Sequence, residues 1–93
     1  MKASWNNRII AESNDTRIVE NNHYFPSESV HREYLKKSKD TYTCPWKGLA
    51  EYYDVTVDGE TVTNGAFSYP DPTPAAKEIQ GRFAFWNGVD VAP

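Results

Sequence analysis

The residues best suited to chemistry lie together in segment 43–48 (TCPWKG), which holds the only cysteine of the chain. Pro45 fixes its own φ and favours an extended Cys44, and Gly48 can adopt the positive φ of a sharp entry into a strand. Such a turn would hold the Cys44 thiol close to the Lys47 ammonium. A nearby cation favours the thiolate, which is the nucleophilic form. Cys44 and Lys47 are therefore the candidate catalytic residues.

The same segment also has a purely structural interpretation. A lone free cysteine is usually buried and packs as a small hydrophobic residue, and Lys47 could extend along Trp46 into solvent. Of the two histidines, His31 is the candidate proton carrier, although its place after a predicted turn is more typical of a surface residue. One cysteine and two histidines do not have the spacing of a zinc site, so we expect no metal and no cofactor.

Length and composition indicate one domain covering residues 1–93, with 39% hydrophobic and 25% charged residues. The formal net charge is −3, so the chain lacks the basic field that holds a phosphate backbone, and we expect no nucleic-acid partner. The densest basic stretch, residues 36–39, is followed at once by Asp40 and is typical of a solvated loop. A homo-oligomer remains compatible with this composition.

The expected location is the cytoplasm. A single cysteine excludes an intramolecular disulfide and favours a reducing compartment. The first residues lack the apolar segment of an export signal, and no apolar run approaches the ~20 residues of a membrane-spanning helix. We therefore expect no membrane association.

Short alternating segments and frequent turn signals predict an all-β fold in which an antiparallel sheet curls into a barrel-like or two-layer arrangement. Strands are expected at 8–13, 16–20, 23–25, 32–35, 49–57, 60–63, 66–69 and 82–86. The first three should be joined by tight turns at Asn14-Asp15 and Asn21-Asn22, because these residues tolerate positive φ. Very short helices are expected at 27–31 and 74–80, and a polar loop at 36–41.

The clearest strand is 49–57, in which Leu49, Tyr53, Val55 and Val57 share one face by period-two alternation, interrupted only by Glu51. Asp58-Gly59 is the strongest hairpin signal of the chain and should place Val55 opposite Val62. Asn64-Gly65 allows a bulge in the returning strand. Tyr52 points away from the valine face, so both faces of this strand should be covered.

Five motifs in this order resemble the domain-of-unknown-function 427 family over nearly the whole chain. They are residues 10–16 (IAESNDT), 24–26 (YFP), 43–53 (TCPWKGLAEYY), 68–72 (SYPDP) and 79–85 (IQGRFAF). The resemblance implies a single Mss4-like domain with a strongly bent sheet, and no established activity. Some members carry a nucleotidyltransferase label, but this chain lacks a Gly-Ser motif followed by paired acidic metal ligands. Phe67 stands where the family often has Trp, and Trp86 where it usually has Tyr, which suggests packing positions.

Three functions remain open from the residues. The first is a binding module whose cleft beside Cys44–Gly48 holds a small polar or anionic molecule. Its candidate ligand-binding residues are Tyr24, His31, Trp46, Gly48 and Tyr52. The second is a cysteine-dependent enzyme that uses Cys44, with Lys47 as the activating cation and His31 or a tyrosine moving protons. The third is a structural or accessory protein that acts through an edge strand or an oligomer.

Overall fold

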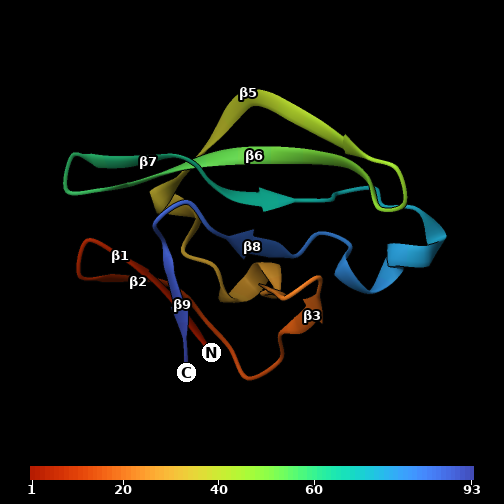
Figure 1. Cartoon of the computed structure of the whole chain (residues 1–93). Helices are drawn as coiled ribbons and strands as arrows, with labels where there is room; N and C mark the ends of the chain where they lie inside the picture. The colour runs from red at the N-terminus through yellow and green to blue at the C-terminus, as the bar shows by residue number, and fades with distance from the viewer.

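Nine β-strands and three short 3₁₀ helices make up residues 1–93 in the computed structural model (Figure 1). The strands are β1 (Lys2–Trp5), β2 (Arg8–Glu12), β3 (Arg17–Val19), β4 (Asn22–Tyr24), β5 (Leu35–Cys44), β6 (Gly48–Val57), β7 (Glu60–Ser68), β8 (Phe83–Phe85) and β9 (Asp90–Ala92). The helices are η1 (Ser27–Ser29), η2 (Arg32–Tyr34) and η3 (Pro74–Ile79). The predicted all-β class with very short helices is confirmed.

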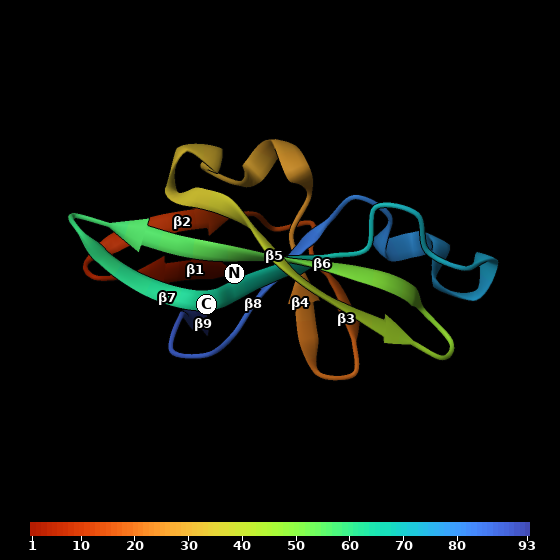
Figure 2. The ribbon, with the colours of Figure 1, turned by 90° about the horizontal axis from the view of Figure 1, so that it is seen from above.

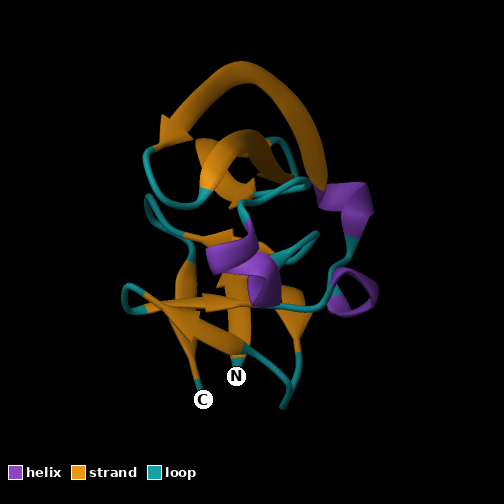
Figure 3. Cartoon of the chain, turned by 90° about the vertical axis from the view of Figure 1, so that its right-hand side faces the viewer, coloured by secondary structure: helices purple, strands orange, loops and turns teal.

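The strands form three antiparallel sheets with the orders β2-β1-β9, β3-β4 and β5-β6-β7-β8. The four-stranded sheet arches over the other two, and the bend is strongest in β5 (Figure 3). Seen from above, the β3–β4 hairpin lies across the middle of the arch (Figure 2). β1 and β9 pair, with Lys2 opposite Ala92, so the two termini lie side by side.

The hairpin predicted at Asp58-Gly59 is confirmed. Both residues have positive φ, +52° and +81°, and Val55 lies opposite Val62. The register then shifts between Val55 and Tyr53, where Asn64 takes a φ of +53° and donates its backbone N–H to a carboxylate oxygen of Asp54 at 2.9 Å. The predicted bulge is therefore present, inside one continuous strand β7.

The hairpin predicted at Asn14-Asp15 is wrong. β2 pairs with β1, a strand that the sequence analysis did not predict, and β3 pairs only with β4. One edge of β2 is taken by β1 through the tight turn at Asn6 and Asn7, both with positive φ, and the other edge is taken by Val30, so neither is free for β3. The turn between β3 and β4 lies at Glu20-Asn21, one residue earlier than expected.

Two further strands were missed. The expected polar loop at 36–41 is part of β5, and the short strand expected at 32–35 is replaced by η2 and the start of β5. β5 is an edge strand that pairs only with β6 and leaves most of its side chains exposed, so its polar sequence carries no alternation. β9 has only three residues, two of them exposed, so it too carries no strand signal.

Two hydrophobic cores lie on the two sides of the four-stranded sheet. The first core comprises Ala3, Ile10, Ala11, Phe25, Val30, Val55, Val57, Val62, Ala66, Phe83, Phe85 and Val89. The second core comprises Tyr24, Cys44, Ala50, Phe67, Tyr69, Ala76, Ile79 and Ala84. Neighbours in sequence alternate between the two cores, as Tyr24 and Phe25 or Ala66 and Phe67 do, because successive side chains of a strand face opposite ways.

Candidate functional site

The turn at 45–47 joins β5 to β6 beside the second core. Cys44 lies opposite Gly48 in the ladder, and Gly48 takes a φ of +108°, which lets the chain re-enter the sheet. Thr73 holds the turn from outside, since its backbone N–H bonds to the Lys47 carbonyl at 3.0 Å and its hydroxyl donates to the Trp46 carbonyl. The predicted conformation of Pro45 and Gly48 thus produces a braced turn.

Lys47 points into the protein. It is 5% exposed and is the only charged residue among the buried ones. Its Nζ donates to Oε1 of Glu20, lies 5.2 Å from the ring centroid of Tyr69 and 5.6 Å from that of Trp46. Burial of an ammonium is unfavourable unless it is paired and surrounded by polarisable groups, and this site supplies both.

The electrostatics of the site keep Lys47 charged. Burial alone would lower the pKa of its ammonium, but the hydrogen bond to Glu20 and the phenols of Tyr24 and Tyr69 raise that pKa above its usual value. The same hydrogen bond lowers the pKa of Glu20. Burial raises the pKa of Tyr24 to about 12 against the lowering effect of the nearby Lys47 ammonium, and the Tyr24 hydroxyl makes no hydrogen bond of normal geometry. Lys47 is therefore a fixed cation and unsuited to act as a base.

A pocket of about 160 Å³ opens beside Lys47. Its lining is mostly aromatic: Asn22, Tyr42, Lys47, Tyr52, Phe67, Tyr69 and Trp86. These residues come from strands β4, β5, β6 and β7, from the turn, and from the segments after β7 and β8. A small concave site with aromatic walls and a few polar groups is the usual form of a small-molecule site.

The aromatic wall has a defined geometry. The rings of Tyr52 and Trp86 are nearly parallel, with 6.1 Å between their centroids and 11° between their planes. Phe67 packs edge-on against Trp86, with 5.4 Å between the ring centroids. The Trp86 indole donates to the carbonyl of Asn64 at 2.6 Å, so the bulge in β7 fixes the ring. Burial also raises the pKa values of Tyr52 and Tyr69, which remain neutral donors at neutral pH.

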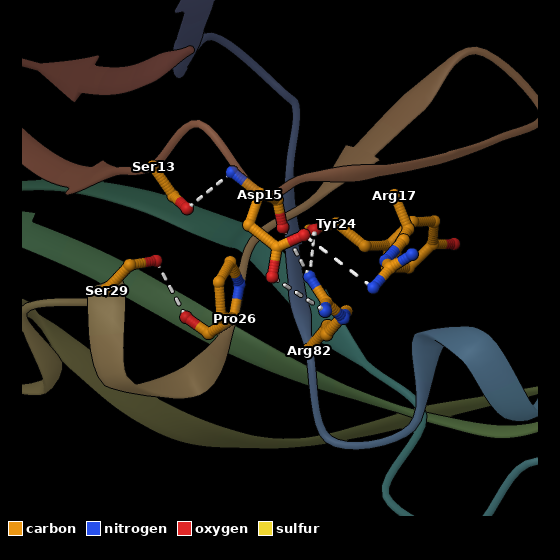
Figure 4. Close-up of polar contacts among 7 residues, drawn as sticks. All are labelled: Ser13, Asp15, Arg17, Tyr24, Pro26, Ser29 and Arg82. Atoms are coloured by element: carbon orange, nitrogen blue, oxygen red, sulfur yellow. Dashed lines mark hydrogen bonds and ion pairs between the residues drawn. The ribbon is translucent and has the colours of Figure 1, made fainter.

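The β3–β4 hairpin brings Glu20 and Asn22 to this site. The hairpin is itself anchored by Arg82 (Figure 4). The Arg82 guanidinium donates to the carbonyl of Asp15 at 2.6 Å and to that of Tyr24 at 3.4 Å. It also donates to the Asp15 carboxylate at 3.5 Å. Figure 4 shows Arg82 reaching between the start and the end of the hairpin, which sets the direction of its tip.

The structure gathers most of the candidate residues. Lys47 and Tyr52 line the pocket, while Cys44 and Tyr24 lie behind it in the second core. Trp46 is 42% exposed and donates its indole N–H to Oε2 of Glu20 at 3.5 Å. Gly48 shapes the turn. His31 lies elsewhere and is exposed. Its backbone N–H donates to the Ile10 carbonyl at 2.8 Å, and its ring centroid is 6.4 Å from that of Tyr34.

Several residues of the site were missed by sequence reasoning: Glu20, Asn22, Tyr42, Phe67, Tyr69 and Trp86. Phe67 and Trp86 were interpreted as packing positions only. The hairpin register offered a signal for Phe67, because it lies opposite Tyr52 once the bulge is counted. Glu20 offered none, since its partner is 27 residues away.

Residues 1–92 match the family described as domain of unknown function (DUF427). The chain belongs to this family. No curated protein matches the chain. Within this DUF427 protein, no helix is long and apolar enough to cross a membrane, and no group of three metal-ligating side chains is present.

Proposed function

We propose that this protein is a small-ligand binding module whose ligand occupies the aromatic pocket beside the turn at 45–47. The observation that carries the proposal is the combination of that pocket with a buried, permanently charged lysine at its edge. Core packing alone would place an apolar side chain at Lys47, because a buried ion pair is rarely more stable than a well-packed hydrophobic replacement.

The size and lining of the pocket define the class of ligand. A volume of about 160 Å³ accommodates one ring with a small substituent. Tyr52, Trp86 and Phe67 offer faces and edges for stacking, and Asn22 and the tyrosine hydroxyls offer hydrogen bonds. We also propose a cytoplasmic location, because a single cysteine favours a reducing compartment.

The alternative of a cysteine-dependent enzyme has less support. Cys44 is buried in the second core and is not among the pocket-lining residues, whereas Lys47 directs its ammonium at Glu20. A structural or accessory role through an edge strand is served by β5, whose outer edge is free. Neither alternative accounts for the aromatic pocket.

Binding of a neutral one-ring probe tests the proposal. Phenol titrated into the protein should shift the two-dimensional NMR signals of Tyr42, Tyr52, Phe67, Tyr69 and Trp86 and leave the first core unchanged. Trp86→Ala should weaken phenol binding by about tenfold, because it removes one stacking face. Trp5→Ala is the matched control, since Trp5 also donates its indole N–H to a carbonyl but lies outside this pocket. Shifts scattered over the surface, or equal binding by both variants, would contradict the proposal.

A further inference from the structure

Glu20 occupies an unusual position at the tip of the β3–β4 hairpin. It takes a φ of +52° and Asn21 a φ of +66°, the conformation of a tight turn that favours Asn or Gly at both places. A glutamate in left-handed backbone is disfavoured, and such residues concentrate at functional sites. Glu20 therefore has a strained backbone conformation, and in this conformation its carboxylate contacts Lys47.

The turn at 45–47 binds this carboxylate through two donors. The Lys47 ammonium donates to Oε1 of Glu20, and the Trp46 indole donates to Oε2 at 3.5 Å. The two partners differ in burial: the Lys47 side chain is 7% exposed and that of Glu20 is 53% exposed. The cation is thus built into the protein, while the carboxylate is solvated and can be exchanged.

Lys47 also lines the pocket, and its ammonium lies 5.2 Å from the ring centroid of Tyr69, a second pocket residue. It is the only buried cation, and it carries one positive charge. A ligand with a single carboxylate matches that charge and copies the group that the chain itself supplies. Burial, the Tyr42 phenol and then the Asp40 carboxylate raise the pKa of Tyr52, so this side of the pocket offers nothing to a second negative charge.

We infer that the ligand is a ring compound bearing one carboxylate, and that this carboxylate competes with Glu20 for the ammonium of Lys47. The inference rests on the proposed function. Glu20 then acts as an internal competitor. It pairs with Lys47 when the pocket is empty, and a ligand carboxylate must bind the ammonium more strongly than Glu20 does in order to displace it. A neutral ring compound enters the same pocket without this competition.

Three probes of similar size separate the possibilities: benzoate, benzamide and benzyltrimethylammonium, measured by isothermal titration calorimetry at low ionic strength. Benzoate should bind about tenfold more tightly than benzamide. Glu20→Gln should strengthen benzoate binding by about three- to tenfold and leave benzamide unchanged. Lys47→Met should abolish the preference for benzoate. Glu12→Gln is the matched control, because Glu12 forms an exposed ion pair with Lys2 at 4.0 Å, and it should have no effect.

The outcomes distinguish the inference from the proposed function. If benzamide and phenol bind in the pocket but benzoate has no advantage, the carboxylate inference is overturned and the binding module stands. Preferential binding of benzyltrimethylammonium, favoured by Glu20 and Asp40 beside aromatic rings, would also overturn it. If Glu20→Gln only lowers the melting temperature and leaves the benzoate-to-benzamide ratio unchanged, Glu20 is a structural partner alone. Absence of binding by every probe, phenol included, would overturn both.

Discussion

Tyr24 and Phe25 are neighbours at the end of β4 and are both fully buried, yet they enter two different environments. Phe25 packs in the first core among aliphatic residues and Phe85, whose ring centroid is 5.6 Å away. Tyr24 packs in the second core, where its hydroxyl has no partner. The first core is built of aliphatic side chains and phenylalanines, with the Arg32 guanidinium 4.6 Å from the Phe83 ring, whereas the second retains a buried phenol beside the buried Lys47.

This difference separates stability from function within a small domain. A polar group that is buried without a partner costs about 1–3 kcal/mol, and a buried charge requires a partner from another element. Both features occur beside the pocket and neither occurs in the first core. We therefore interpret the first core as the source of stability, and the second as the wall of the site.

The largest expected effect comes from truncation in the first core. Phe25→Ala should lower the free energy of unfolding by about 3–5 kcal/mol, because it removes a buried ring and leaves a cavity. Tyr24→Ala should cost less, since it also removes an unpartnered hydroxyl next to an open pocket. Urea denaturation of both variants measures the difference. Equal costs would show that the two cores contribute alike.

Intermediate effects are expected at Gly48 and Gly59, which both have positive φ. Gly48 begins β6 and Gly59 lies in the turn that follows it. Gly59→Val should cost about 1–2 kcal/mol, because a β-branched residue resists positive φ. A Cβ at Gly59 would meet no atom within 4 Å, so the penalty comes from the backbone alone. Phenol binding should be unchanged. Gly48→Val should lower both stability and phenol binding.

Gly59→Asn is the control for the backbone penalty, since asparagine tolerates positive φ. It should be close to wild type in thermal melting. A Gly59→Val protein that melts at the wild-type temperature would argue against the positive-φ turn.

The smallest effect at neutral pH is expected for Tyr24→Phe. This change removes the unpartnered hydroxyl and keeps the ring, so the free energy of unfolding should stay within about 1 kcal/mol of wild type or increase. Tyr34→Phe, outside the second core, controls for the loss of one phenol. If urea denaturation shows that Tyr24→Phe lowers the free energy of unfolding by more than about 1 kcal/mol, the Tyr24 hydroxyl makes a stabilising hydrogen bond.

Alkaline pH should expose the same residue. The pKa of Tyr24 is about 12 in the folded protein and 10.0 for an unperturbed tyrosine. Its contribution to stability is complete below pH 10 and is lost as the pH rises toward 12, because the unfolded chain releases the proton first. Unfolding followed by circular dichroism should therefore become easier over this range, and less steeply so in Tyr24→Phe. An identical pH dependence in both proteins would contradict the burial of the Tyr24 hydroxyl.

Features whose information lies within a few residues follow from the sequence alone. Asp58-Gly59 specified a two-residue turn, and that turn placed Val55 opposite Val62. The alternation in 49–57 predicted two covered faces of β6, with the valines in one core and Tyr52 beside the other, but the prediction fails at Leu49, which is 47% exposed. Pro45 restricts the backbone and Gly48 permits a positive φ, so the turn that presents Lys47 could be predicted as well.

Which distant groups meet depends on how the sheets pair in three dimensions. β3 pairs with β4 and not with β2, because one edge of β2 pairs with β1 and the other receives the segment at Val30 and His31. This pairing points the tip of the β3–β4 hairpin at the turn and places Glu20 on Lys47, 27 residues away. A lysine in a turn is normally solvated, and nothing local reveals that it will be buried. Its burial follows from the partner, and the partner's position follows from the pairing of the sheets.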